Sequence, residues 1–285
     1  MQRIENKTFQ GERPLYKIKD TLLSNIVIGE GESGIKECQH IQIENCVFEG
    51  KYPLWECHDM TIRNSHLSDG ARAALWYSKD IVMENCQVDS PKTFRELDNL
   101  KLSNVTIRSA TETLWFCRNI ELLNVEIGEG DNLFLHSYGI RCNNIKLNGK
   151  YSFQYCKDIE ITDSVILTKD AFWNTENVTI RNSRLKGEYL AWYSKNLHLI
   201  NCHIEGTQPL CYAENLIIEN CTFAPDADLA FEYSSVNATI NGSITSVKNP
   251  SSGTIIANGI DEVIINEDKK GDAKCEIITT AQQLS

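Results

Sequence analysis

The chain has 285 residues, with 28 lysines and arginines against 39 aspartates and glutamates, so its formal charge is −11. This balance excludes a protein whose main role is to coat nucleic acid or anionic lipid, because both tasks need net positive potential. The chain shows neither an apolar signal-peptide core at its N-terminus nor any apolar run near the roughly 20 residues that span a bilayer. Its 11 cysteines are odd in number and form no Cys-x-x-Cys pair, which favours a reducing compartment. We therefore expect a cytoplasmic protein without nucleic-acid or membrane partners.

A repeat of 19–21 residues runs along almost the whole chain. Each unit has apolar residues four and two positions before a polar marker, and another apolar residue three positions after it. The markers are Asn25, Asn45, Asn64, Asn85, Asn104, Asn124, Asn144, Asp163, Asn182, Asn201, Asn220 and Asn241. Alternation with a period of two indicates a strand with one buried face. One such unit buries too little apolar surface to offset its conformational entropy, so the units must stack as a solenoid.

The spacing decides between the solenoid types. Left-handed β-helices repeat in hexapeptides and do not fit, and a leucine-rich horseshoe places its asparagine at other offsets. The sequence therefore predicts an all-β protein, a right-handed parallel β-helix of about twelve coils, with the leucine-rich horseshoe as the alternative. We expect a single domain over residues 1–285, in which 1–14 cap one end, 15–267 form the coils and 268–285 trail from the other end.

Residues at equal offsets in successive coils form columns. The marker column predicts a structural ladder of asparagine amides inside a bend. Five residues before it, a column from His40 to Asn215 is rich in residues that tolerate left-handed backbone and predicts a turn corner. Cysteines alternate with serines in two further columns, as expected for small side chains at tight corners. Cys38, His40, Cys57 and His58 lie on adjacent coils, but their columns face different sides, so we expect no metal site and no cofactor.

One column holds every tryptophan, nine residues before the marker: Trp55, Trp76, Trp115, Trp173 and Trp192. The residue before each tryptophan is core-like, so alternation predicts that the indoles point outward. Arg95 takes the same place in a coil without tryptophan. Polar and charged side chains border the column and complete the candidate binding set: Arg72, Lys92, Glu96, Asp131, His136, Lys150, Lys169 and Asp170.

Several strings of the sequence resemble a known family. They include Phe9–Leu15 (FQGERPL), Lys51–Trp55 (KYPLW), Ala71–Tyr77 (ARAALWY), Pro91–Arg95 (PKTFR), Glu112–Trp115 (ETLW), Lys169–Trp173 (KDAFW), Gly187–Leu190 (GEYL), Leu229–Tyr233 (LAFEY) and Asn249–Thr254 (NPSSGT). These strings are similar to an uncharacterised family of bacterial parallel β-helix proteins, known as a domain of unknown function and grouped by fold with the pectin-lyase-like proteins. The resemblance covers essentially the whole chain and implies the fold, but it carries no activity. Of the strings that polygalacturonases share, only Asn174-Thr-Glu176 comes near, so the catalytic residues and the enzyme question stay open.

Two functions from different classes fit these observations. In the first, the protein binds or processes an acidic carbohydrate, or binds another anionic small ligand. The tryptophan column would stack on sugar rings, and arginines and lysines would bind carboxylates or phosphates. In the second, the protein is a non-catalytic interaction scaffold whose tryptophan column binds a protein partner or another copy in a homo-oligomer. A purely structural alternative is that a loop, the C-terminal tail or another subunit covers the column. The exposure of the indoles distinguishes the two.

Overall fold

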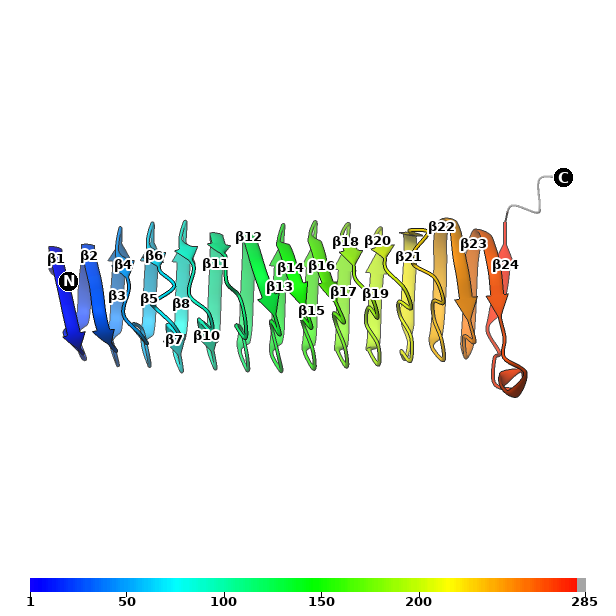
Figure 1. Ribbon diagram of the computed structural model, residues 1–285, viewed down its shortest axis with the longest axis horizontal. Coiled ribbons are helices and arrows are strands. Elements are labelled where there is room, and N and C mark those ends of the chain that lie inside the picture. The colour runs from blue at the N-terminus through cyan, green and yellow to red at the C-terminus, as the bar shows by residue number, and fades with distance from the viewer. Residues whose placement is uncertain (281–285) are drawn as a thin grey trace. The chain divides into compact units, whose positions relative to one another are not determined.

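The computed structural model describes residues 1–280 and divides into two compact units, residues 1–148 and 149–285. The described part contains strands and a single short 3-10 helix, η1 (Glu267–Lys269). None of its helices has the length and apolar character needed to cross a membrane. Figure 1 shows the strands of each unit succeeding one another in chain order.

Unit 1 is a stack of parallel strands, one long strand from each coil. Along the stack these are β1 (Gln2–Glu12), β2 (Lys19–Glu32), β3 (Gln39–Glu44), β5 (His58–Arg63), β8 (Lys79–Glu84), β11 (Asp98–Ile107), β12 (Arg118–Asp131) and β13 (Tyr138–Asn143). Short strands form further sides of the coils: β4 (Val47–Phe48), β6 (His66–Leu67), β7 (Leu75–Trp76), β9 (Gln87–Val88) and β10 (Phe94–Arg95). The register joins equal positions of the repeat, for example Ile43 with Ile62 and Ile62 with Met83.

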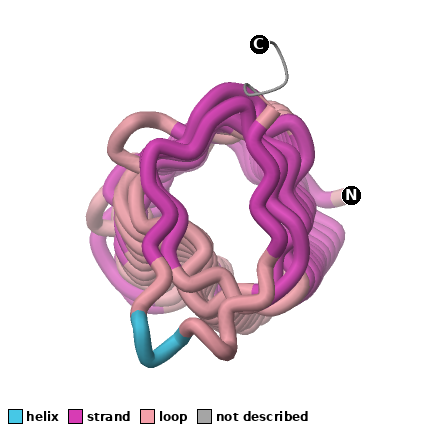
Figure 2. The backbone as a smooth tube through the Cα atoms, turned by 90° about the vertical axis from the view of Figure 1, so that its right-hand side faces the viewer, coloured by secondary structure: helices cyan, strands magenta, loops and turns pink. Residues whose placement is uncertain are grey.

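Unit 2 repeats the same construction. Its long strands are β15 (Lys157–Thr162), β17 (Glu176–Arg181), β19 (Lys195–Ile200), β21 (Leu216–Phe223), β22 (Ser235–Lys248), β23 (Ser252–Ile264) and β24 (Glu276–Thr279). The shorter strands are β16 (Val165–Lys169), β18 (Arg184–Lys186) and β20 (His203–Glu205), and β14 (Lys146–Lys150) lies at the division between the units. In Figure 2 the coils at the β24 end are seen as bent loops, with η1 projecting from one corner.

The parallel solenoid is therefore confirmed, and the leucine-rich alternative is not. Eight long strands in unit 1 and seven in unit 2 give 15, more than the predicted twelve coils. The count differs because the markers begin at Asn25 and end at Asn241, whereas β1 precedes the first marker and β23 and β24 follow the last. β1 occupies most of the predicted cap, and β24 pairs with β23 within the predicted tail, of which residues 281–285 lie outside the described residues. The right-handed sense and the single domain stay predictions.

The core consists of the columns whose side chains the alternating sequence pattern places on the inner face of the coils. The residue before each tryptophan of unit 1 is fully buried, and Phe94 and Phe134 fill the same column in coils without tryptophan. In unit 2, the buried rings of Phe153 and Phe172 stack with their centroids 4.7 Å apart and their planes 8° from parallel. Because each coil places its large side chain over that of the previous coil, neither unit needs a second layer to bury its apolar face.

The corner residues adopt the left-handed backbone conformation that was predicted from their residue types. The φ angle is +53° at Asn104 in the marker column and +61° at Asn99 in the earlier column, which confirms the predicted turn. The amide of Asn104 donates to Oδ1 of Asn85 at 3.1 Å, and the amide of Asn124 donates to Asn104 at 3.0 Å. These side chains are exposed, so the prediction that they lie inside the bend is wrong. A left-handed corner residue projects away from the core, where water and its neighbours satisfy the amide.

Candidate functional site

The tryptophans of unit 1 point outward but lie against the surface, half-buried. The indole N–H of each donates to a backbone carbonyl of the next coil: Trp55 to Ala73 and Trp76 to Lys92, both at 2.7 Å, and Trp115 to Asn132. A buried indole N–H needs such a partner. These hydrogen bonds therefore connect successive coils along the tryptophan column.

The flat faces of these indoles are occupied by neighbours in the same column. Trp55 and Trp76 stack with centroids 5.5 Å apart and planes 13° from parallel. The guanidinium carbon of Arg95 lies 4.9 Å from the ring centroid of Trp76 and 4.2 Å from that of Trp115. Arg95 thus sits between two indoles, a cation–π arrangement. The predicted stacking of sugar rings needs a free indole face, whereas Trp76 lies between Trp55 and Arg95, and Arg95 also covers one face of Trp115.

The basic groups beside this ladder are also engaged. Nζ of Lys92 and Nη2 of Arg95 both lie 2.7 Å from Oε2 of Glu112. The hydrogen bond from Lys92, with a further one from Arg95, holds the pKa of Glu112 below its usual value. Arg72 is exposed, and Asp131 is half-buried with its carbonyl accepting from the Glu112 amide at 2.8 Å. The predicted anion-binding role of Lys92 and Arg95 would require a ligand to displace Glu112.

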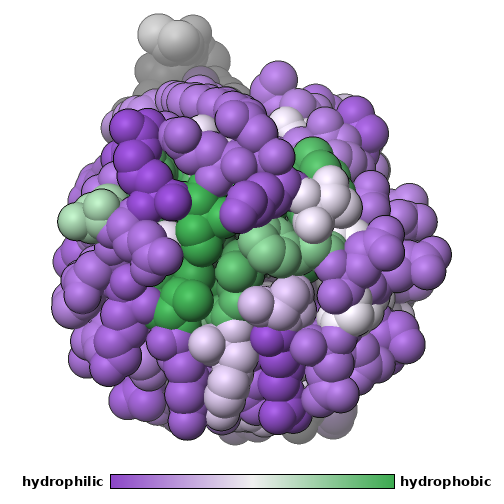
Figure 3. Space-filling view, turned by 90° about the vertical axis from the view of Figure 1, so that its left-hand side faces the viewer, coloured by the Kyte–Doolittle hydropathy of each residue, from purple (hydrophilic) through white to green (hydrophobic). Residues whose placement is uncertain are grey.

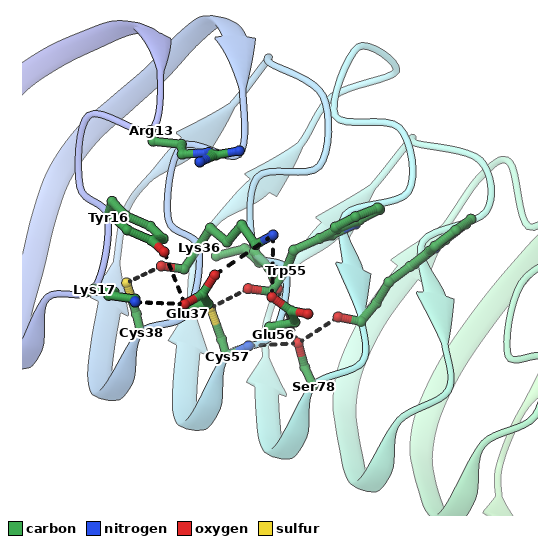
Figure 4. Close-up of polar contacts among 12 residues, drawn as sticks. Arg13, Tyr16, Lys17, Lys36, Glu37, Cys38, Trp55, Glu56, Cys57 and Ser78 are labelled. Atoms are coloured by element: carbon green, nitrogen blue, oxygen red, sulfur yellow. Dashed lines mark hydrogen bonds and ion pairs between the residues drawn. The ribbon is translucent and has the colours of Figure 1, made fainter.

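The N-terminal end of the same surface is an ion-pair network (Figure 4). Lys36 occupies the tryptophan column one coil before Trp55, with its Nζ 5.7 Å from the indole centroid. The same Nζ lies 3.3 Å from Glu56, and Glu37 accepts from the Tyr16 hydroxyl at 3.0 Å. Here donors and acceptors satisfy one another.

The next column, one residue after the tryptophans, presents exposed aromatic rings. Tyr77 and Phe116 are 44% and 48% exposed, and both have φ angles near +57° (57° and 56°). Left-handed backbone is uncommon for bulky residues, and here it turns outward a side chain that strict alternation would turn inward. The ring of Phe116 lies at 88° to that of Trp115 and that of Tyr77 at 84° to that of Trp76. These rings therefore face a different direction from the stacked indoles.

Two rows of this surface enclose a shallow depression of about 490 Å³, lined by Glu96, Phe116, Arg118, His136 and Tyr138. Phe116 and His136 lie 5.5 Å apart with planes 5° from parallel. The guanidinium carbon of Arg118 is 5.9 Å from the centroid of Tyr138, whose side chain is 44% exposed. We call the depression together with Tyr77 the aromatic face of unit 1.

Two charged side chains of the aromatic face, Arg118 and Glu96, form no ion pair with a described residue. The strand register places Asp98 directly opposite Lys79 on one side and Arg118 on the other. None of these three forms an ion pair with a described residue, and Asp98 instead accepts from the Asn119 amide at 3.1 Å. Glu96 is exposed and forms no ion pair within residues 1–280. A guanidinium and a carboxylate are therefore available beside exposed rings.

The sequence prediction included Glu96 and His136 from this depression but missed Phe116, Arg118 and Tyr138. The sequence itself shows an aromatic column, containing Phe116, one residue after the tryptophan column. It does not show the outward direction of this column, because that direction depends on the left-handed φ angle.

The unit 2 part of the candidate set is arranged differently. The indole N–H of Trp192 donates to the Gln208 carbonyl at 2.7 Å, whereas the buried N–H of Trp173 has no partner among the described residues. Nζ of Lys169 lies 2.9 Å from Glu188, Lys150 is exposed, and burial raises the pKa of the half-buried Asp170. Of the predicted site residues, the structure brings Glu96 and His136 together in one depression of unit 1 and joins Lys92 and Arg95 through Glu112.

In the exposed columns of unit 2, side chains of neighbouring coils contact one another. Tyr193 and Tyr212 stack with centroids 4.9 Å apart and planes 17° from parallel. Two cross-strand ion pairs follow, Lys157 with Glu176 at 2.7 Å and Lys195 with Glu214 at 3.0 Å. This surface offers a ligand fewer unsatisfied groups than the aromatic face does.

Within the described part of the chain, no three histidine, cysteine, aspartate or glutamate side chains are grouped closely enough to hold a metal ion. Cys38 and Cys57 are buried, whereas His40 and His58 are exposed, as the separate columns predicted. His40 lies between two exposed carboxylates, 3.6 Å from Asp20 and 3.2 Å from Asp59.

Comparison with known proteins finds the following similar structures. Among solved structures, a tailspike protein of E. coli bacteriophage HK620 in complex with a hexasaccharide matches at a TM-score of 0.47 and 10% identity, over 92% of this chain and 62% of that chain. The Streptococcus pneumoniae surface protein and adhesin PfbA matches at 0.38 and 9% identity, over 97% and 91%. HetL, a pentapeptide repeat protein from the cyanobacterium Nostoc sp., matches at 0.31 and 11% identity, over 78% and 92%.

The chain thus spans 62% of the tailspike chain that it matches. No curated protein matches the sequence. The family model described as "Protein of unknown function (DUF3737)" matches residues 2–278. The chain belongs to the DUF3737 family.

Proposed function

We propose that the protein binds a carbohydrate at the aromatic face of unit 1. The observation that carries this proposal is the depression in which exposed rings lie beside an unpaired guanidinium and an unpaired carboxylate, from Arg118 and Glu96. Elsewhere on the same surface, charged groups at the N-terminal network and beside the tryptophan ladder are paired with one another.

The mixture of groups suits a sugar better than a simple anion. A sugar presents apolar C–H faces together with hydroxyls that both donate and accept hydrogen bonds. Phe116 and Tyr138 offer apolar surface, Arg118 offers only donors and Glu96 only acceptors. An isolated anion would have no use for Glu96, which offers only acceptors.

A carboxylate on the sugar would bind Arg118. The guanidinium fork matches a carboxylate, and Arg118 forms no ion pair with any described residue. Lys92 and Arg95, in contrast, are held by Glu112. The specificity for an acidic sugar that the sequence assigned to the tryptophan column is therefore proposed here for Arg118.

We propose binding rather than processing. A glycosidase needs two carboxyl groups at the scissile bond, one of which keeps its proton near neutral pH. In unit 1 the pKa of Glu112 is lowered, chiefly by the hydrogen bond from Lys92. Asp170, whose pKa is raised by burial, belongs to unit 2.

A cytoplasmic location forms part of the proposal. All 11 cysteines are free thiols and 10 of them are buried in the stack, which suits a reducing compartment.

Isothermal titration with trigalacturonate and with its methyl ester tests the proposal. We expect Phe116→Ala to weaken binding of both sugars about fivefold or more, because an exposed aromatic contact is lost. Arg118→Ala should abolish the preference for the free acid, a loss of about tenfold or more. Tyr193→Ala in unit 2 is the matched control and should leave both affinities unchanged. Absence of binding by the unmodified protein at millimolar concentrations of either sugar would contradict the proposal.

A further inference from the structure

The first coil of unit 1 ends in an open strand edge. β1 pairs with β2 along Gln2–Glu12, and no strand within residues 1–280 pairs with its other side. An open strand edge carries unpaired N–H and C=O groups that can pair with another chain. Figure 3 faces this end of unit 1 and shows hydrophobic surface at its centre, surrounded by hydrophilic side chains. Ile4 and Phe9, in the core-facing columns, are only half-buried here.

The last coil of unit 2 also has one strand partner. β24 pairs with β23 through Ile255 with Ile277 and Thr254 with Glu276, and no other described strand pairs with it. Ile277, which shares the core-facing column of Ile255, is half-buried.

The repeat register shows which residues would meet if these two ends stacked. Ile4 lies two positions before Asn6, the marker-type residue of the first coil, and it pairs with Leu23 in the same column. In unit 2 this column runs through Ile161, Ile180, Leu199, Ile218, Ala238, Ile255 and Ile277. An in-register stack would therefore place Ile277 of one copy over Ile4 of the next. One position earlier, Glu276 would lie opposite Arg3.

The two ends carry opposite charges. Residues 2–20 contain five basic and three acidic side chains, a net charge of +2. Residues 253–280 contain three basic and six acidic side chains, a net charge of −3. Arg3 is 65% exposed, and among residues 1–280 its guanidinium forms an ion pair only with Glu5, at 2.8 Å, so it can exchange partners without unburying a charge.

We propose that copies of this chain associate head to tail, with β24 of one copy pairing in parallel with β1 of the next. The opposite charges favour this contact over an N-terminal end against another N-terminal end, where like charges would meet. Directly opposed charges on neighbouring strands are stabilising, and like charges are destabilising. A head-to-tail contact uses two different surfaces, so each copy can bind two others and association can continue beyond a dimer.

Lys7 limits the strength of this contact. Lys7 pairs with Ile26, which is 1% exposed, and so occupies a core-facing column. With a one-residue register shift like the one between β21 and β22, Lys7 would lie over Thr279 in the stack, because Thr279 pairs with Ala257 and Ala257 with Ile240 in that same column. An inward-pointing charge on an edge strand opposes association. The oligomers are therefore reversible and form at high protein concentration.

Sedimentation velocity of the full chain across a concentration series, at low and high salt, tests the proposal. We expect the weight-average mass to rise with concentration and to fall when salt screens the charges. Arg3→Glu and Glu276→Arg should each weaken association about tenfold or more, because each places like charges together. The combined R3E/E276R variant reverses the pair and should restore association to within about threefold of the original.

Lys7→Ile removes the inward-pointing charge from the same contact. Unlike the two charge-reversal variants, it should strengthen association, by about tenfold or more. Circular dichroism of every variant establishes that the coils remain folded. A mass that stays monomeric at all concentrations, even in Lys7→Ile, would overturn the proposal. Association that ignores Glu276→Arg but responds to Arg3→Glu would overturn it in favour of contact between two N-terminal ends. Because none of these residues lies on the aromatic face, sugar binding should be unchanged throughout.

Discussion

The aromatic face of unit 1 and the matching surface of unit 2 come from the same columns of the repeat but differ in what they leave unsatisfied. In unit 2, Lys195 and Glu214 pair across strands, and Tyr193 stacks on Tyr212. In unit 1, Arg118 and Asp98 are opposite one another yet form no ion pair. A solenoid column can therefore either stabilise the stack or leave groups available to a ligand, depending on whether its neighbouring side chains contact one another.

The order of charges along a column does not explain this difference alone, because Lys79, Asp98 and Arg118 of unit 1 also alternate in charge and form no ion pair with a described residue. In unit 2, the column that contains the first residues of β15, β17 and β19 alternates in charge over four coils, as Lys157, Glu176, Lys195 and Glu214, and each lysine meets a carboxylate of the next coil. In unit 1, Tyr138 follows Arg118 and breaks this alternation. In the tryptophan column, Arg95 takes the place of an indole and fills the space between two rings.

We expect the cores of the two units to be equally well packed. Large-to-small substitutions of buried residues test this, because they measure how much each side chain stabilises its unit. Phe134→Ala in unit 1 and Phe172→Ala in unit 2 should each lower the free energy of unfolding by about 3–5 kcal/mol, because both rings are fully buried. Urea denaturation gives both values. A loss below about 1 kcal/mol in one variant alone would show that the two stacks are packed differently.

The buried carboxylate of Glu205 in unit 2 should make stability pH-dependent. Its side chain is 9% exposed, and hydrogen bonds from Arg184 and then Lys186, which outweigh the effect of burial, lower its pKa from 4.5 to about 2. Because the folded-state pKa is depressed, this stabilisation is present above about pH 4.5 and is lost as the pH falls towards about 2. The contribution is about 3 kcal/mol at most.

Urea denaturation at pH 7 and at pH 3, for the original protein and for Glu205→Gln, measures this contribution. We expect the variant to have the lower stability at pH 7 and a smaller change between the two pH values. An equal change in both proteins would assign the pH dependence to other carboxylates.

Removing the cation between the indoles of unit 1 should have a smaller effect. Arg95→Ala loses two cation–π contacts and a hydrogen-bonded ion pair with Glu112, which together contribute about 1–2 kcal/mol. The free energy of unfolding and the tryptophan fluorescence spectrum should both change. Arg95→Lys keeps the charge but not the planar stacking, so it should recover only part of the stability. Full recovery would mean that charge alone matters at this position.

The smallest effect is expected for the exposed ion pairs of unit 2. The side chains of Lys195 and Glu214 are 55% and 68% exposed. Lys195→Ala should therefore change the free energy of unfolding by no more than about 0.5 kcal/mol, a value that thermal denaturation bounds. A loss near that of Arg95→Ala would show that the surface pairs of unit 2 stabilise the stack as strongly as the ladder of unit 1.

The columns could be predicted from the sequence because stacking repeats the same environment in every coil. Strict alternation correctly placed Phe94 and Phe134 in the core. It failed at the corner after the tryptophans, where the left-handed backbone of Phe116 turns the ring outward. Which charges pair depends on side-chain geometry between coils, so the sequence could not show that Lys92 and Arg95 are held by Glu112 while Arg118 is not.

Hydrogen–deuterium exchange with and without trigalacturonate tests most directly whether the unsatisfied surface is the one that binds. We predict slower exchange in the sugar-bound protein for peptides that contain Glu96, Phe116 and Tyr138, with no change around Tyr193 and Tyr212. Protection confined to the unit 2 peptides would contradict the account, because it would place the ligand on the surface whose side chains already satisfy one another.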